Sequence, residues 1–219
     1  MSLASLLEVV LPPSCAGCSR YGTVLCVACS RGLRPASDVA TAFLADDAGA
    51  LGGTEVELVV SAFRHEGVAR RCLQRLKYGG ACRLADPLAR AALPAFDGLL
   101  AVSGPSVLVP VPVHVSRARE RGYNQALLLA GALGAARQLP VVELLTRPRA
   151  TRRQHALDRS ARLANLRSAF AATARRAQPG RVIVVDDILT SGATMEACAS
   201  VLHEAGVGLV YGFALAREI

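Results

Sequence analysis

The sequence of 219 residues has no tryptophan, and only four tyrosines and five phenylalanines. The core must therefore be built mainly from aliphatic side chains, and few rings are available to stack on nucleic-acid bases. No uninterrupted apolar run approaches about 18 residues, so the sequence predicts no membrane insertion. The apolar start Met1–Leu11 carries Glu8 and no early Lys or Arg, which makes it a poor signal peptide. We therefore expect a cytoplasmic protein.

Acidic residues are also in the minority. There are 17 Asp and Glu residues against 25 Lys and Arg residues, which gives a formal net charge of +8. Such a balance favours anionic partners, among them phosphates, nucleotides and nucleic acids, without selecting one of them. The length allows one large domain with an appendage, or two small domains.

The most informative stretch begins with the apolar run Val182–Val185 and continues with two acids, Asp186 and Asp187. Four branched apolar residues in a row are typical of a strand buried on both faces, as in a parallel sheet. Acids at the carboxyl end of such a strand lie where open α/β sheets bind ligands. The carboxylates can accept hydrogen bonds from the vicinal hydroxyls of a sugar.

A small polar loop follows this strand and precedes an expected helix over Met195–Ala205. At a helix start, unpaired backbone N–H groups and the helix dipole both favour an anion such as phosphate. Together with the acids, the loop predicts a site for a ribose 5-phosphate. The alternative is a plain strand–turn–helix unit with a capped helix. The loop residues are Thr190, Ser191, Gly192, Ala193 and Thr194.

Two Cys-x-x-Cys pairs lie near the start of the chain, Cys15 with Cys18 and Cys26 with Cys29. Each pair can form a tight turn, and two such turns supply four thiolates for a tetrahedral structural Zn²⁺. A redox pair and a chance arrangement are the alternatives. The other cysteines, Cys72, Cys82 and Cys198, stand singly in helical patterns and are expected to be buried thiols.

Strands and helices alternate from residue 107 onward, which predicts an α/β fold with a mainly parallel sheet flanked by helices. The run Val107–Val113 contains two prolines, so we expect a strand that ends in a rigid loop before His114. A helix interrupted near Pro94 is expected over Cys82–Phe96. Residues 146–176 are rich in arginine, including Arg152 and Arg153.

The stretch from Val182 to Thr194 resembles the motif that binds phosphoribosyl pyrophosphate (PRPP) in type I phosphoribosyltransferases. The segments Pro110–His114 and Arg119–Gln125 resemble a signature of the ComF family of competence proteins. Further matches to that family are Leu76–Gly80 and a later series: Thr151, Gln154, Leu157, Arg162, Asn165 and Phe170. The resemblance implies a four-cysteine zinc-finger-like module (1–34), a linker (35–54) and a type I phosphoribosyltransferase-like domain (55–219).

The resemblance further implies a transferase that moves the phosphoribosyl group of PRPP to an unknown acceptor with Mg²⁺. Asp186 and Asp187 would hold the ribose hydroxyls, directly or through Mg²⁺, and Thr190–Thr194 would hold the 5-phosphate. The rigid loop Val111, Pro112, Val113 and His114 would face the pyrophosphate. Arginine grips two phosphate oxygens at once. Candidates to meet the leaving group are Lys77, Arg119, Arg121, Arg152 and Arg153.

Two other functions stay open on this sequence. In the first, the chain is an accessory protein of DNA uptake that binds single-stranded DNA or a competence helicase, with PRPP or a nucleotide as a regulatory ligand. The scarcity of aromatic residues argues against strong stacking on bases, since each stacked base contributes ~1–3 kcal/mol. In the second, the fold senses PRPP or a nucleotide without chemistry.

Overall fold

The computed structural model describes residues 12–36, 55–78, 80–148, 168–173 and 179–218. Expectations that fall outside these ranges, such as residues 37–54 of the predicted linker (35–54) and the arginines at 152 and 153, are not addressed by the structure. Within the described ranges, no helix has both the length and the apolar content that a membrane span needs.

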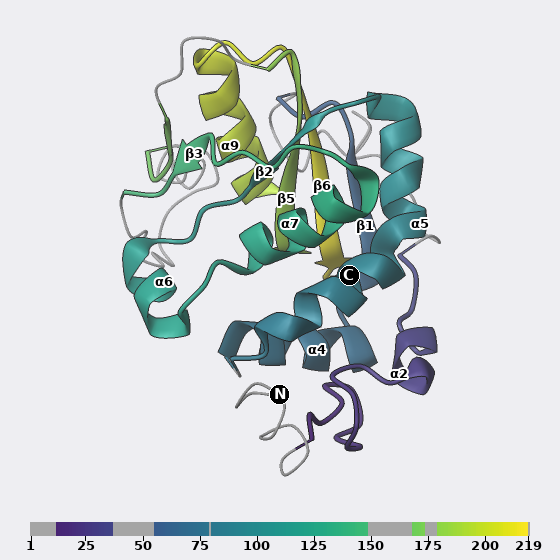
Figure 1. Cartoon of the computed structure of the whole chain (residues 1–219). Helices are drawn as coiled ribbons and strands as arrows, with labels where there is room; N and C mark the ends of the chain where they lie inside the picture. Colours follow the sequence, from purple (N-terminus) through teal and green to yellow (C-terminus); the bar gives the residue numbers. More distant parts are fainter. Residues whose placement is uncertain (1–11, 37–54, 79, 149–167, 174–178, 219) are drawn as a thin grey trace.

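The centre of the molecule is a four-stranded parallel sheet in the order β1-β6-β5-β2 (Figure 1). It confirms the predicted α/β fold with a mainly parallel sheet flanked by helices. A short antiparallel pair, β3 with β4, lies apart from it. The strands are β1 (Val59–Arg64), β2 (Val107–Pro110), β3 (Leu145–Thr146), β4 (Ala171–Ala172), β5 (Arg181–Leu189) and β6 (Leu209–Arg217).

Helices cover both faces of the sheet (Figure 1). The α5 and α7 helices pack on one face and α9 packs on the other. The helices are α2 (Val27–Arg31), α4 (Gly67–Tyr78), the 3₁₀ turn η3 (Cys82–Leu84), α5 (Ala85–Ser103), α6 (Val115–Arg121), α7 (Gln125–Arg137) and α9 (Ala193–Glu204).

The alternation of side chains along β5 builds these two layers. Ile183 and Val185 join the core under α4, α5 and α7, whereas Val182 and Val184 join the core under α9. Successive residues of a strand point to opposite faces, so an unbroken apolar run fills both layers. The run Val182–Val185 is therefore continuously apolar in the sequence and does not alternate with polar residues.

One expectation about the helices is wrong. The helix over Cys82–Phe96 was predicted to be interrupted near Pro94, but α5 continues through Pro94 to Ser103. Pro94 is exposed, while Phe96 and Leu99 are fully buried on the opposite side. A proline on the solvent face removes one hydrogen bond where a helix tolerates bending, and the buried apolar face keeps the helix in place.

The α7 helix offers a matched pair of glycines that tests this packing. A Cβ on Gly134 would lie 2.8 Å from the carbonyl oxygen of Leu139 and 2.8 Å from Val141 Cγ2, whereas nothing lies within 4 Å of a Cβ on Gly131. We expect Gly134→Ala to lower the free energy of unfolding by ~1–3 kcal/mol through overpacking. Gly131→Ala should raise it by up to ~1 kcal/mol, because alanine is the better helix former.

Urea unfolding followed by circular dichroism measures both changes. If both substitutions shift the unfolding free energy in the same direction, the close packing of α7 against the segment before β3 is wrong.

Candidate functional site

A cavity of about 420 Å³ lies at the carboxyl ends of β2 and β5. Ligands bind at this edge in open α/β sheets, since loops and helix starts converge there. The sheet side of the cavity is formed by Asp186 and Asp187 of β5, Thr194 of α9 and the segment from Val111 to Val113. The other walls carry Lys77 and Tyr78 at the end of α4, residues of α6 and the start of α7, and Arg147.

The two carboxyl groups point toward different neighbours. Because side chains alternate along a strand, Asp187 faces the layer of α4, where its Oδ2 lies 3.0 Å from Lys77 Nζ. Both side chains of this ion pair are largely buried. Asp186 interacts electrostatically with Arg147 and with the thiol of Cys198, on the side of α9. The cavity therefore receives one carboxyl group from each face of β5.

The surroundings of Asp186 favour its protonated form. Loss of solvent is the largest cause and the adjacent charge of Asp187 the second, and together they raise the pKa of Asp186 to about 8. The amide of Asp187 donates a hydrogen bond of 2.8 Å to Asp186 Oδ1, which opposes the shift in pKa. Near neutral pH Asp186 therefore holds its proton, beside the ion pair of Asp187 with Lys77.

The loop from Thr190 to Thr194 enters α9 through Gly192, whose φ of 75° lies in the left-handed region. No side chain caps α9 in the described part of the chain. The first intrahelical bond recorded here is donated by Glu196 to the carbonyl of Gly192. The amides before it are the donors that bind anions at helix starts. The predicted phosphate loop thus has its helix start uncapped, and Thr194 reaches the cavity.

The loop after β2 is held at its start, Val111, by two hydrogen bonds. The amide of Val111 donates to the carbonyl of Val185, and Asn124 Nδ2 donates to the carbonyl of Val111 at 3.0 Å. Val111, Pro112 and Val113 line the cavity. His114 is not among the lining residues; its Nδ1 accepts from the amide of Ser116 and caps α6.

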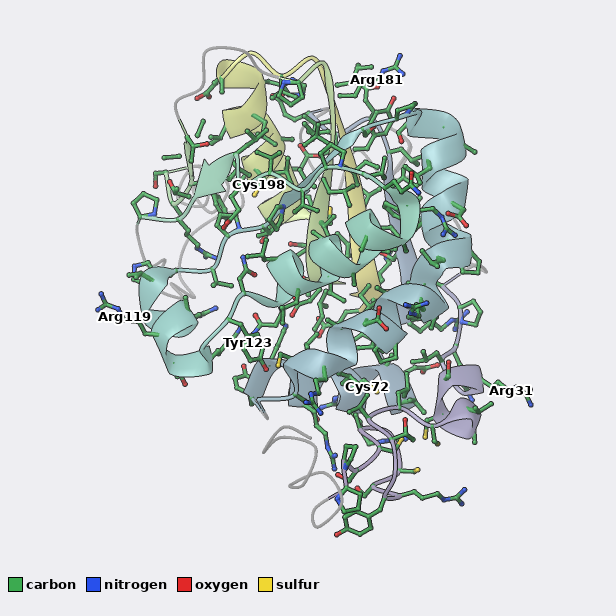
Figure 2. All side chains as sticks on the ribbon, in the orientation of Figure 1. Arg31, Cys72, Arg119, Tyr123, Arg181 and Cys198 are labelled. Atoms are coloured by element: carbon green, nitrogen blue, oxygen red, sulfur yellow. The ribbon has the colours of Figure 1, made fainter. Side chains whose placement is uncertain are left out.

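The predicted basic residues have different positions. Lys77 and Arg121 line the cavity. Arg119 extends outward from α6 (Figure 2). Two other candidates, Arg152 and Arg153, lie outside the described residues.

Sequence reasoning missed several lining residues, among them Arg117, Glu120, Asn124, Gln125 and Arg147. Burial lowers the pKa of the Arg147 guanidinium, which stacks over Phe170 at 5.1 Å. The α6 helix was not expected. For all of them except Arg147, the signal in the sequence was the segment 117–125, where charged and amide side chains lie close together around the junction of two helices.

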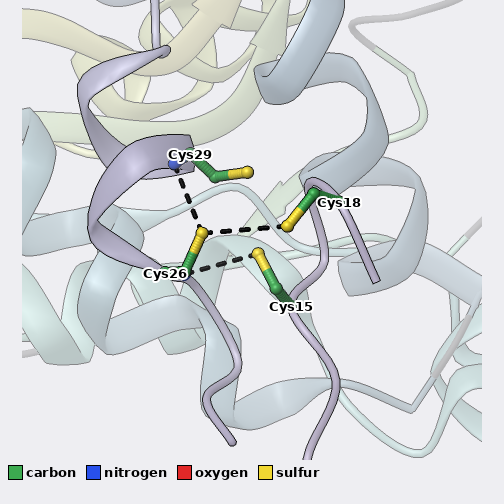
Figure 3. A group of neighbouring side chains, drawn as sticks. All are labelled: Cys15, Cys18, Cys26 and Cys29. Carbon is green, nitrogen blue, oxygen red and sulfur yellow. Dashed lines mark hydrogen bonds between the residues drawn. The ribbon is translucent and has the colours of Figure 1, made fainter. Parts of the chain in front are cut away.

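The four paired cysteines converge near the N-terminus (Figure 3). All four Sγ atoms lie within 4.8 Å of one another, and Cys18 and Cys26 are 3.8 Å apart. Four sulfurs ~2.3 Å from a tetrahedral ion would be separated by roughly 3.8 Å. The cluster could hold a metal ion, and its all-thiol composition is consistent with structural zinc. The ligands are Cys15, Cys18, Cys26 and Cys29.

The thiols differ in their readiness to ionise. Burial alone raises the pKa of Cys15, but hydrogen bonds from the amides of Cys26, Cys18 and Gly17 outweigh it and lower the pKa to about 6. Burial, with the neighbouring sulfur of Cys26, raises the pKa of Cys29. Thiolates are the metal-binding form, so Cys15 is ready to bind while Cys29 needs the cation to ionise.

The cysteine module packs directly on α4. Arg71 Nε donates to the carbonyl of Gly17 at 2.7 Å, and Arg75 donates to Ser14 Oγ and Ser19 Oγ. Cys15 and Cys29 belong to the same hydrophobic cluster as the buried residues of α4 and α5. The α4 helix therefore contacts the cysteine module through Arg71 and Arg75, and its last turn places Lys77 in the cavity wall.

The remaining cysteines only partly match expectation. Cys72 and Cys198 are fully buried, as predicted. Cys82 is exposed, so its prediction as a buried thiol is wrong. It begins the short 3₁₀ turn before α5 rather than occupying the buried face of a helix.

Comparisons with known proteins found relatives over half of the chain. No protein-family model matches. Competence protein F of Haemophilus influenzae is 34% identical over 116 residues, which is 52% of this chain and 51% of the relative. DNA utilization protein YhgH of Escherichia coli K12 is 35% identical over 118 residues, with the same shares. Competence protein ComFC of Bacillus subtilis is 34% identical over 113 residues, 51% of this chain and 45% of the relative. The matched part spans about half the length of these relatives.

A solved structure described as the allosteric regulatory enzyme of purine biosynthesis is 24% identical to this chain. It covers 53% of this chain and 23% of its own, with a TM-score of 0.33. At that TM-score, the likeness supports no statement about activity.

Removing one metal ligand should affect the whole chain, because the module shares its core with α4 and α5. We expect Cys18→Ser to lose bound zinc and to lower the free energy of unfolding by several kcal/mol, roughly 3 or more. Cys82→Ser, which replaces an exposed thiol outside the cluster, is the control and should leave both quantities unchanged. Zinc content by mass spectrometry and urea unfolding measure the effects. Equal zinc content in both variants would contradict a metal site here.

Stability should depend on pH through Asp186. Its pKa is raised in the folded state, so its contribution to stability is fully present below the unfolded value near 4 and is lost as pH rises through about 8. Asp186→Asn cannot lose a proton. Wild type should therefore lose stability with rising pH where the variant does not. Between about pH 5 and about pH 8, the free energy of unfolding of Asp186→Asn minus that of wild type should increase by ~1–3 kcal/mol.

Asp97→Asn is the matched control. A hydrogen bond from Arg137 lowers the pKa of Asp97, so this carboxyl group is ionised at both pH values and its replacement should have the same effect at each. Urea titrations at the two pH values compare the variants. A difference for Asp186→Asn that does not change with pH would refute the raised pKa.

Proposed function

We propose that this chain, a relative of the ComF-family competence proteins, binds PRPP and transfers its phosphoribosyl group to an acceptor. The observation that carries the proposal is one cavity that combines a carboxyl pair, basic side chains and the uncapped start of α9. The predicted resemblance to the ComF family is confirmed by relatives at about 34% identity that include Competence protein F and ComFC.

The carboxyl pair would bind the ribose. Asp187 uses Oδ2 for its ion pair with Lys77, which leaves Oδ1 to accept a hydrogen bond from a ribose hydroxyl. Asp186, protonated near neutral pH, can both donate to and accept from a hydroxyl. Each of two vicinal hydroxyls can donate and accept a hydrogen bond. Asp187 would only accept from a hydroxyl, whereas Asp186 could also donate to one.

The phosphate groups would lie on either side of the ribose. The uncapped start of α9, with the hydroxyl of Thr194, supplies donors for the 5-phosphate. The loop Val111–Val113 and the cationic groups of Lys77 and Arg121 would face the pyrophosphate. Arg147, on the side of Asp186, adds a further positive charge to the same cavity.

In the reaction, an acceptor nucleophile would form a bond to ribose C1 as the bond from C1 to pyrophosphate breaks, and the pyrophosphate would leave with the electron pair. The protein's contribution would be to position the sugar and to neutralise the leaving group. Mg²⁺ would offset the negative charge of the pyrophosphate, and Asp186 and Asp187 are the carboxyl groups in the cavity wall that would hold it.

The proposal includes the division into a module (1–34), a linker (35–54) and a phosphoribosyltransferase-like domain (55–219), with structural zinc in the module. The metal would fix the position of α4 and thereby of Lys77, since Arg71 and Arg75 tie α4 to the cysteine loops.

A second function is favoured by the names of the relatives, which refer to competence and DNA utilization. In that function the chain would assist DNA uptake, with single-stranded DNA or a helicase as partner and PRPP as a regulatory ligand. Binding to phosphates alone would be strongly weakened by salt.

Calorimetry with PRPP and Mg²⁺ tests the proposal. The double substitution Asp186→Asn and Asp187→Asn should reduce affinity by about 100-fold or more, since it replaces the carboxyl groups that would bind the ribose hydroxyls with neutral amides and removes any carboxylate ligand of Mg²⁺. The control is Asp86→Asn with Asp97→Asn, which makes the same two replacements at exposed positions outside the cavity.

Unchanged affinity of the double variant would overturn the proposed site. If wild-type protein shows no PRPP binding but forms a salt-sensitive complex with a single-stranded oligonucleotide, the second function is favoured. Pyrophosphate release in the presence of nitrogen-containing acceptors would distinguish transfer from mere binding.

A further inference from the structure

The segment Arg121–Gln125 ties together three walls of the cavity. Gly122 ends α6 in the left-handed conformation, with φ of 81°. The hydroxyl of Tyr123 donates to the carbonyl of Leu76 in α4 at 2.7 Å. Asn124 caps α7 through its Oδ1 and holds the loop after β2 through its Nδ2. The polar atoms of Tyr123 and Asn124 are therefore used within the protein.

Arg121 and Gln125 differ from these neighbours. Arg121 Nη1 donates to Gln125 Oε1 at 3.0 Å, and the guanidinium lies 5.1 Å over the ring of Tyr78. Since Oε1 of Gln125 accepts this bond, the orientation of the amide is fixed and Nε2 is left as a donor. Gln125 is only 2% exposed and lies in the cavity wall.

Two donors of this pair are buried without a hydrogen-bond partner among the described residues. They are Arg121 Nε and Gln125 Nε2. Buried donors are paired in about 90% of cases or more, and an unpaired one costs ~1–3 kcal/mol. Two of them on neighbouring side chains in the wall of a polar cavity indicate that a ligand supplies the acceptor.

The chemistry of that ligand follows from the donors and their surroundings. Both groups are N–H donors that accept no hydrogen bond, so they recognise a hydrogen-bond acceptor such as oxygen. Lys77, Arg117 and Arg147 line the same cavity and favour an anionic oxygen. Asn124 donates to the carbonyl of Val111, which keeps the loop Val111–Val113 next to the pair of Arg121 and Gln125. This is the loop proposed to face the pyrophosphate.

We infer that Gln125 Nε2 and Arg121 Nε bind a phosphoryl oxygen of the pyrophosphate group, which makes Gln125 a binding residue of the site. The inference rests on the proposed function for the identity of the ligand, but the donor pair itself would bind free pyrophosphate as well. Tyr123 and Asn124 act as positioning residues, because they hold the pair against α4 and the loop after β2.

Calorimetry with PRPP, inorganic pyrophosphate and ribose 5-phosphate tests the inference on wild type and three variants. Gln125→Glu keeps the shape and the bond with Arg121 but removes the N–H donor, and Gln125→Met removes the donor without adding charge. We expect both variants to bind PRPP and pyrophosphate at least about tenfold more weakly than wild type, with ribose 5-phosphate affinity unchanged. Gln138→Glu, at the exposed far end of α7, is the matched control and should bind as wild type does.

Each outcome decides the matter. Equal loss of ribose 5-phosphate affinity would show a structural role and overturn the inference. If Gln125→Glu binds PRPP and pyrophosphate more weakly but Gln125→Met does not, the loss comes from charge repulsion, and the role of Gln125 as a donor is overturned. Unchanged PRPP affinity in both variants would overturn the inference while leaving PRPP binding intact. If wild type binds pyrophosphate in a Gln125-dependent way but not PRPP, the donor pair stands and the proposed function fails; binding of neither overturns both.

Discussion

The ion pair between Lys77 and Asp187 connects the α4 helix to strand β5 of the central sheet. Lys77 is at the end of α4, and Asp187 follows the buried run of β5. Both groups are largely removed from water, so the pair is favourable only because each partner is held in place by its own element. Breaking it by moving α4 would leave an uncompensated carboxylate in the cavity, and this makes the position of α4 a condition for the site.

The position of α4 in turn depends on the cysteine module. Arg71 and Arg75 use their guanidinium groups on backbone and hydroxyl oxygens of the loops that carry Cys15 and Cys18. The module and α4 share one hydrophobic cluster, so a metal bound to the thiols stabilises more than the short loops around it. The cysteine cluster and the cavity are thus linked by α4, which contacts the cysteine loops through Arg71 and Arg75 and carries Lys77 at its end.

Sequence patterns predicted the strands β2 and β5 well, because these follow from local physics. The branched run Val182–Val185 is buried on both faces of the sheet, as its sequence predicted. Patterns failed where packing overrides propensity. Pro94 indicated an interruption, yet α5 continues because its buried face holds it, and Cys82 lies on an exposed turn.

The sequence by itself determined the parallel sheet, the convergence of four thiols and the placement of two acids at the end of a strand, since periodicity and spacing encode all three. Only the tertiary structure decided which partners these groups have. It pairs Asp187 with Lys77, surrounds Asp186 so that its pKa rises, and adds Gln125 and Arg147 to the cavity. These contacts join residues far apart in the chain, and no local pattern specifies burial or the approach of one helix to another.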